Sequence, residues 1–219
     1  MIENKETLKR FCYALSTENE VVQFSSCFLK KNKNSIWAIT SFECYNYQKY
    51  YVVILEIQSR LNVSDILKKL DAFSENKKNG FKLSEKKLLK RIFKKNAENK
   101  KISSNKLRNK RFVMTLMLKE NRELLEAYKE IHKPDKIWPE IIENMNTMGI
   151  QEMEIYLQGC QAFLIMDTSP NFDLDKDGQK WASLPREKEW QEYVAKFQKV
   201  NPKSKAVEKW KQMALLIQQ

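Results

Sequence analysis

The sequence contains a single histidine, His132, among 219 residues. Glycine and proline are also scarce, at four and five residues, which excludes collagen-like and low-complexity architectures. The four cysteines show no CxxC spacing, which favours reduced thiols in a cytoplasmic protein. The longest apolar run, from Tyr50 to Leu55, is too short to span a membrane, and the start of the chain lacks the apolar region of a signal peptide. We therefore expect a cytoplasmic protein with a packed core and no membrane partner.

Positive charge is abundant, with a net charge of +12. Most of it lies in residues 77–111, which hold 15 lysines and arginines against two glutamates. Such a run is usually a solvated helix or connector, with RNA contact as the alternative. Its only aromatic residues, Phe81 and Phe93, are too few for a base-stacking platform, so nucleic acid is not expected as a partner. The spacing of its apolar residues predicts a basic amphipathic helix over residues 84–96.

The chain divides into three parts. Residues 1–76 are predicted to form an N-terminal α+β domain, residues 77–110 a basic helical connector, and residues 111–219 a second α+β domain. In the first domain the pattern predicts strand, helix, strand, strand and helix, over residues 9–15, 18–30, 36–45, 50–58 and 62–73.

The second domain begins with an apolar strand over residues 112–118, followed by a helix that Asn121 caps and that extends to His132. Pro139 begins another helix, which Gly149 ends. The remaining predictions are strands over 152–157 and 162–168, helical sequence over 179–199 and a final strand over 211–217. The order β-α-β-β-α-β is the ferredoxin-like signature.

A short internal similarity links the two domains. Residues 9–15 parallel residues 110–116, and the order of elements that follows is similar in both. Either chance or a true duplication explains this similarity. If the duplication is real, the first copy is a degenerate ferredoxin-like unit, because its helix has no histidine and no Trp-Pro pair follows it.

The candidate chemistry centres on His132 and Tyr128. The i, i+4 spacing places both side chains on one face of a helix. An imidazole exchanges protons near neutral pH, so a phenol beside it gives a plausible proton-transfer pair.

Short motifs recur in a fixed order through the C-terminal half: Lys110–Phe112, Tyr128, His132, Ile137–Ile141, Gly149–Ile150, Met153–Tyr156, Phe163–Met166, Glu189–Trp190 and Phe197–Gln198. With this order and these gaps, residues 110–217 resemble the L-rhamnose mutarotase family, and within it the type 2 L-fucose mutarotases. The first 100 residues show no such match beyond the opening strand.

The resemblance implies a ferredoxin-like α+β fold that dimerises through its sheets into a barrel. It also implies interconversion of the α and β anomers of a 6-deoxy-hexose, a reaction that needs no cofactor and no metal. By the same resemblance His132 is the proton donor, Tyr128 lies beside it at the sugar and Trp190 stacks on the sugar. The protein would then be a homodimer, or a one-chain pseudo-dimer if the first domain takes the partner's place.

Two positions depart from the rhamnose-type members. Met153 stands where those members have a tyrosine, and Gln191 stands where they have a second stacking tryptophan. Both are candidate substrate-binding positions, and their identities favour a sugar other than L-rhamnose. Tyr156 is a further candidate substrate-binding residue. The second proton-transfer group is not identified by the sequence; Tyr156 and Glu154 are candidates.

Three hypotheses for the function remain open. The chain is either an isomerase, a non-catalytic sugar- or partner-binding protein with a basic connector, or a cofactor-free monooxygenase on the same barrel.

The acidic run at Asp173, Asp175 and Asp177 resembles the start of a calcium loop but has no glutamate at the closing position. We therefore interpret it as a turn and expect no metal site.

Overall fold

The computed structural model describes residues 7–28, 37–59, 61–68, 88–95, 109–200 and 209–218. The chain forms two units, of which the first comprises Met1–Leu89 with Ala214–Gln219, and the second Lys90–Met213. Each unit is a mixed α/β structure built on one antiparallel sheet. The chain passes from the first unit to the second after Leu89 and returns after Met213.

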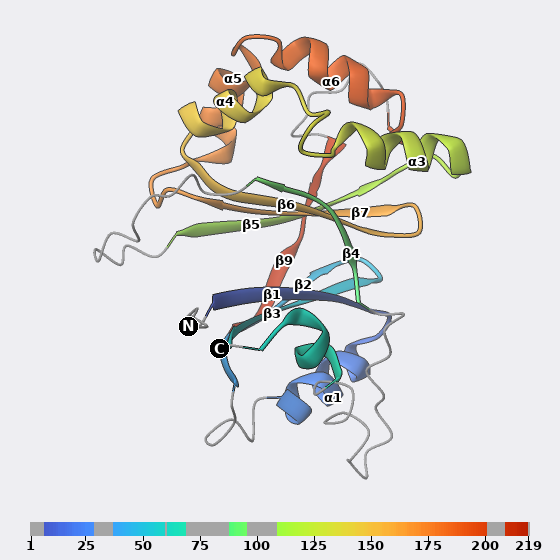
Figure 1. Ribbon diagram of the computed structural model, residues 1–219, viewed down its shortest axis with the longest axis vertical. Coiled ribbons are helices and arrows are strands. Elements are labelled where there is room, and N and C mark those ends of the chain that lie inside the picture. The colour runs from blue at the N-terminus through green and yellow to red at the C-terminus, as the bar shows by residue number, and fades with distance from the viewer. Residues whose placement is uncertain are drawn as a thin grey trace, which may run out of the picture. The chain divides into compact units, whose positions relative to one another are not determined.

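The first unit has a four-stranded sheet in the order β1-β3-β2-β9. Its strands are β1 (Thr7–Leu15), β2 (Trp37–Tyr47), β3 (Tyr50–Ser59) and β9 (Ala214–Gln218). Helix α1 (Glu18–Phe28) follows β1, and a short helix at residues 63–68 follows β3 (Figure 1). A single bridge between Tyr13 and Leu88 extends the pairing on the other side of β1. The strands and helix predicted here are confirmed, although part of the helix expected over 62–73 lies outside the described residues.

The second unit has a five-stranded sheet in the order β4-β6-β7-β5-β8. Its strands are β4 (Lys90–Lys95), β5 (Lys110–Met117), β6 (Ile150–Gln158), β7 (Gln161–Thr168) and β8 (Lys211–Gln212). Its helices are α3 (Arg122–Ile131), α4 (Pro139–Thr147), α5 (Leu174–Ala182) and α6 (Glu187–Ala195). From β5 to β8 the order of elements is β-α-β-β-α-β, with each α a pair of helices, as predicted.

All four helices of the second unit lie on one face of its sheet (Figure 1). Alternate residues of β5 and β7, such as Phe112, Met114, Leu164 and Met166, form the core with these helices. Tyr128 of α3 packs in a separate cluster with Leu116 and Leu157 of the same sheet, and this packing positions the single histidine. Alternation along a strand sends the intervening residues to the other face, where they are buried as well.

Strand β4 corrects the sequence prediction, because a basic helix was expected over residues 84–96. Residues 90–95 instead pair antiparallel with β6, with Lys90 opposite Leu157 and Lys95 opposite Met153. Partly buried and fully buried residues alternate toward the end of the strand, which fits the two-residue period of a strand. Its charge is partly neutralised within the sheet, since Arg91 and Lys94 lie 2.9 and 3.4 Å from the buried Glu154 carboxylate.

The helical sequence expected over 179–199 is two helices, and the first begins earlier, at Leu174. Asp173 is the N-cap of α5, and its carboxylate accepts the backbone N–H groups of Asp175 and Lys176. The acidic run is therefore the first turn of a helix, where negative charge is favourable. The final strand is also divided, because Met213 separates β8 from β9.

Each sheet carries an ion pair between its first and third strands, counted from β1 in the first unit and from β5 in the second. Arg10 of β1 is 2.8 Å from Glu56 of β3, and Arg111 of β5 is 2.6 Å from Asp167 of β7. In both units the two residues are direct partners in the strand register. The four side chains are at most 15% exposed, so both pairs are largely withdrawn from water.

A second equivalence lies on β2 and β6. The Tyr45 hydroxyl donates to Glu43 at 3.0 Å, and the Tyr156 hydroxyl donates to Glu154 at 3.0 Å. Residues two apart on a strand share a face, so each tyrosine and its glutamate lie on the same side of the sheet. The two units thus have similar topologies and similar buried polar pairs.

Cys12 and Cys44 are buried, and burial raises the pKa of Cys44 to about 12. None of the described helices has the length and apolar character needed to cross a membrane.

Candidate active site

His132 lies at the C-terminal end of helix α3, in the interior of the second unit. The helix begins where the Asn121 side chain accepts the Leu124 backbone N–H at 2.9 Å, and it ends at His132, its C-cap residue. Tyr128 is the buried residue of α3, and His132 lies one turn further on, 4% exposed. The predicted i, i+4 relation is therefore present, and both side chains point inward.

The imidazole of His132 is held by a backbone hydrogen bond. Its Nδ1 lies 2.7 Å from the carbonyl oxygen of Tyr128. A carbonyl only accepts, so Nδ1 carries the hydrogen of this bond. In the neutral ring Nε2 is then the unprotonated nitrogen and can accept a proton.

Burial determines the charge of this ring. Desolvation lowers the pKa of His132 to about 4, and the hydrogen bond to Tyr128 opposes that shift only in part. At neutral pH the imidazole is therefore uncharged. In this state Nε2 can accept a proton but has none to donate.

Tyr128 contacts the His132 imidazole with both its backbone carbonyl and its ring. The two ring centroids of Tyr128 and His132 are 4.3 Å apart at an interplanar angle of 51°. Burial raises the pKa of the Tyr128 phenol, so this group stays protonated at neutral pH. The structure brings the two residues together as predicted, and the hydrogen bond between them uses the Tyr128 carbonyl.

Three aromatic side chains surround the imidazole, and we call them the aromatic shell: Phe93, Tyr128 and Trp190. The ring of Trp190, on α6, is 5.7 Å from that of His132 in an edge-to-face arrangement. Phe93, on β4, makes a similar contact at 6.2 Å. The aromatic shell accounts for the low exposure of His132.

Trp138 packs against Trp190 of the aromatic shell. As the N-cap of α4 it precedes Pro139, and its ring is 5.3 Å from that of Trp190. The Arg186 guanidinium lies 4.1 Å from the Trp138 ring centroid and forms an ion pair with Glu140 at 3.1 Å. These contacts join the start of α4 to the start of α6 and fix the position of Trp190.

The two positions that depart from the rhamnose-type members lie in different surroundings. Met153 is 4% exposed and packs in the same core cluster as Trp190. The amide of Gln191 donates to Glu187 at 3.0 Å within α6. Glu187 is itself buried and also accepts from Asn144 at 3.2 Å, so Gln191 belongs to a polar network that links α4 and α6.

Tyr156 and Glu154 are not brought to His132. Met153, Ile155 and Leu157 of β6 pack with the helices, so the alternation of the strand sends Glu154 and Tyr156 to the opposite face. There the Tyr156 hydroxyl donates to the Glu154 carboxylate. The structure thus separates these two candidates for the second proton-transfer group from the imidazole.

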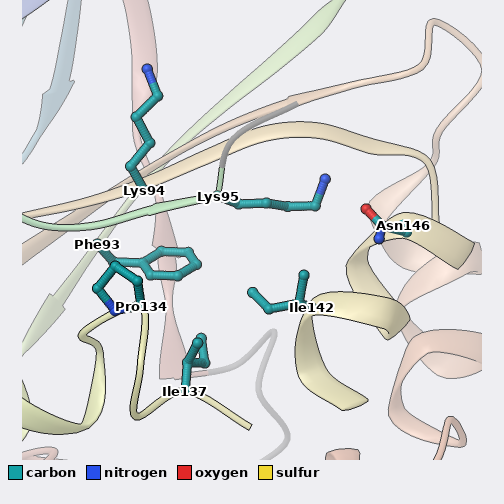
Figure 2. A pocket seen from close by; sticks show the side chains of 7 residues that line it. All are labelled: Phe93, Lys94, Lys95, Pro134, Ile137, Ile142 and Asn146. Carbon is teal, nitrogen blue, oxygen red and sulfur yellow. The ribbon is translucent and has the colours of Figure 1, made fainter. Parts of the chain in front are cut away.

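A hollow of about 170 Å³ lies next to the aromatic shell (Figure 2). Residues of β4, of the turn before α4 and of α4 itself line it, and Phe93 belongs both to the hollow and to the aromatic shell. His132 and Trp190 do not line the hollow themselves. In the part of the chain that the structure describes, no three side chains of metal-ligating type gather in one place.

Sequence reasoning did not identify Phe93 or Arg186 as parts of the site. Phe93 lies in the segment that was expected to be a helix. Arg186 adopts a left-handed backbone conformation with φ of 58°, which brings it to the start of α6, and only the folded chain shows this geometry. Trp138 packs against the core cluster that contains Trp190, and Pro139 begins α4, as predicted.

Comparison with known proteins places this site in a family context. Residues 111–216 match the family described as L-rhamnose mutarotase. An L-fucose mutarotase of Xanthomonas campestris pv. campestris is 29% identical over 102 residues, which is 47% of this chain and 82% of that protein. A UPF0734 protein of Dictyostelium discoideum is 34% identical over 111 residues, 49% of this chain and 87% of the relative.

Among solved structures, an anthrone oxidase-like protein aligns with a TM-score of 0.48 and 10% identity, over 99% of this chain and 94% of its own. Residues 111–216, which match the family, contain helices α3 to α6 and nearly all of strands β5 to β8. His132, Tyr128 and Trp190 are among these residues. Over residues 111–216 the chain belongs to the L-rhamnose mutarotase family.

Proposed function

We propose that the protein is a mutarotase that interconverts the α and β anomers of a 6-deoxy-hexose, with His132 as the proton-transfer group. The observation that carries the proposal is the buried, neutral imidazole whose Nδ1 is bonded to the Tyr128 carbonyl, set in an aromatic shell. Family membership over residues 111–216 supports the same activity.

In this mechanism Nε2 of His132 takes the proton of the anomeric hydroxyl. The bond between C1 and the ring oxygen breaks as the C1 carbonyl forms, and the imidazolium returns the proton to the ring oxygen. Both oxygens are bonded to C1, so one nitrogen can serve them in turn. Rotation about the C1–C2 bond and the reverse steps then give the other anomer, with no net change in protons.

The protein favours this sequence through two features of the site. A neutral imidazole can accept a proton immediately, whereas a charged one would first have to lose its proton. Trp190 and Phe93 offer apolar surfaces to the sugar, the role expected of aromatic side chains beside a pyranose. We further propose L-fucose over L-rhamnose as substrate, since Met153 and Gln191 depart from the rhamnose-type residues and one relative is named an L-fucose mutarotase.

The test is anomer exchange measured by saturation-transfer NMR on L-fucose and L-rhamnose. A His132→Gln variant should lose roughly 10²- to 10⁴-fold in enzyme-dependent exchange, the usual contribution of one acid-base group. Lys133→Ala changes the next residue, which is exposed and paired with Glu130 at 2.5 Å, and should exchange anomers at the parent rate. Equal rates for His132→Gln and the parent protein would contradict the assignment.

The alternative of a non-catalytic binding protein makes a different prediction. It requires no enzyme-dependent anomer exchange together with RNA binding that weakens as salt rises. Arg91 and Lys94, two of the basic residues on which that alternative rests, already pair with Glu154. We therefore place it second.

A further inference from the structure

The hollow beside the aromatic shell has one polar end and an otherwise apolar lining (Figure 2). The side chains of Lys95 and Asn146 point toward one another at the polar end, and Phe93, Ile137 and Ile142 supply apolar surface. Such a mainly apolar cavity with a few placed polar groups is typical of small-molecule sites. At about 170 Å³ it lies below the range of roughly 300–1,000 Å³ for drug-sized ligands, so it suits a single sugar ring.

Lys95 is an unusual side chain for this position. It is 5% exposed although it carries an ammonium group, and its Nζ donates to the Ile150 carbonyl at 2.8 Å. The bond to β6 fixes the direction of the side chain along the hollow. An ammonium has three donors, and the Ile150 carbonyl uses one of them.

Lys94 behaves differently although it is the adjacent residue. Its Nζ is 3.4 Å from the Glu154 carboxylate, and Figure 2 shows its side chain directed away from Lys95 and Asn146. The polar end of the hollow therefore depends on one lysine of β4 and one asparagine of α4.

Phe93 connects the hollow to the imidazole. Its ring lines the hollow and lies 6.2 Å from the ring of His132, centroid to centroid. Phe93 is therefore a residue shared by the hollow and the surroundings of His132, which does not itself line the hollow. Strand β4 is outside the segment that matches the family.

We propose that β4 completes the sugar site: Lys95 and Asn146 bind ring hydroxyl oxygens at the end of the sugar remote from its anomeric carbon, while Phe93 packs against its apolar face. The inference rests on the proposed function and names two specificity-determining residues for the same reaction. These two residues would bind the sugar and take no part in proton transfer. Substituting either of them should therefore raise KM and leave kcat nearly constant.

The test compares Asn146→Ala with Thr147→Ala, its exposed neighbour on α4, in NMR anomer exchange and chemical-shift titration with L-fucose. Loss of one neutral hydrogen bond should raise KM and Kd for Asn146→Ala roughly 3- to 10-fold, with kcat within about twofold of the parent. Thr147→Ala should match the parent protein in both constants.

Lys95→Met provides the second variant, since a charged donor contributes more to binding. It should raise KM by roughly 10- to 100-fold, with folding checked by thermal unfolding. If the parent protein exchanges anomers and both Asn146→Ala and Lys95→Met keep its KM, the inference is wrong and the proposed function stands. If the parent protein neither exchanges anomers nor binds L-fucose, the proposed function fails and this inference fails with it.

Discussion

At the scale of single residues, the surroundings of His132 decide what its imidazole can do. The resemblance to mutarotases implied a proton donor at this position. The structure gives a buried ring with a pKa of about 4 and with Nδ1 bonded to the Tyr128 carbonyl. Under the proposed function such a ring acts first as a base and becomes an acid only after it has taken the substrate's proton, so one residue could perform both steps.

The lowered pKa of His132 also links stability to pH. An unfolded imidazole titrates near 6.5, so between about pH 6.5 and pH 4 the unfolded chain binds a proton that the folded chain does not. The free energy of unfolding should therefore fall as the pH is lowered through this window, by about 3 kcal/mol in full.

Urea unfolding at several pH values checks this prediction. Carboxylates titrate in part of the same range, so the informative quantity is the difference between the parent protein and His132→Gln. That difference should narrow by about 3 kcal/mol from pH 7 to pH 4, because the variant has no group that titrates at this position. A difference that stays constant with pH would show that His132 is not buried in its neutral form.

At the scale of helices and strands, local signals made part of the fold predictable. Asn121 before α3, Pro139 at the start of α4 and Gly149 after it each act within one turn of the chain. The pairing of β4 could not be predicted this way. Its apolar residues, Ile92 and Phe93 among them, fit a helix about as well as a strand, and its partner β6 lies about 60 residues further along the chain.

The same limit applied to the candidate site. His132 and Tyr128 are four residues apart, so their contact followed from helix geometry alone. Phe93 reaches His132 only because β4 adds to the sheet, and its role could not be read from spacing. Tyr156 lies on the opposite face because the phase of β6 is set by packing against the helices.

Two glycines of the second unit allow a matched test of backbone conformation. Gly149, between α4 and β6, has φ of +74°, a conformation that other residues adopt at a cost of roughly 1–2 kcal/mol. Gly178 lies inside α5, and a Cβ there would meet no atom within 4 Å. Gly149→Ala should therefore lower the free energy of unfolding by about 1 kcal/mol or more, whereas Gly178→Ala should raise it by roughly 0.5–1 kcal/mol.

Chemical denaturation of the two variants beside the parent protein gives both values. The opposite signs matter more than the magnitudes, since the two substitutions are chemically identical. A gain in stability for Gly149→Ala would mean that the junction between α4 and β6 does not require the left-handed conformation.

At the scale of the whole molecule, the two units are built alike. Each has a first and third strand joined by an ion pair, Arg10 with Glu56 and Arg111 with Asp167, and each has a tyrosine bonded to a glutamate on its second strand. Each sheet also gains a strand beside that second strand, β9 next to β2 and β4 next to β6. These equivalences support the duplication that residues 9–15 and 110–116 suggested.

If the two units are copies of one another, the chain has less need of a partner. We therefore predict that the protein is a monomer, in which the first unit takes the role that a second subunit would have in a homodimer. Light scattering coupled to size-exclusion chromatography should give 26.1 kDa, the mass of one chain. A stable species of twice that mass across a tenfold dilution would favour the homodimer instead.

The position of β4 has a practical consequence for anyone who trims this protein. A fragment cut to residues 111–216 would keep His132 and Trp190 but lose Lys90–Lys95. The backbone N–H and C=O groups of β6 that pair with β4 would lose their partners, and β6 would become an exposed edge strand. Exposed edge strands promote aggregation. The imidazole would also lose its contact with Phe93, so the pKa of His132 should differ between a soluble fragment of family length and the full chain.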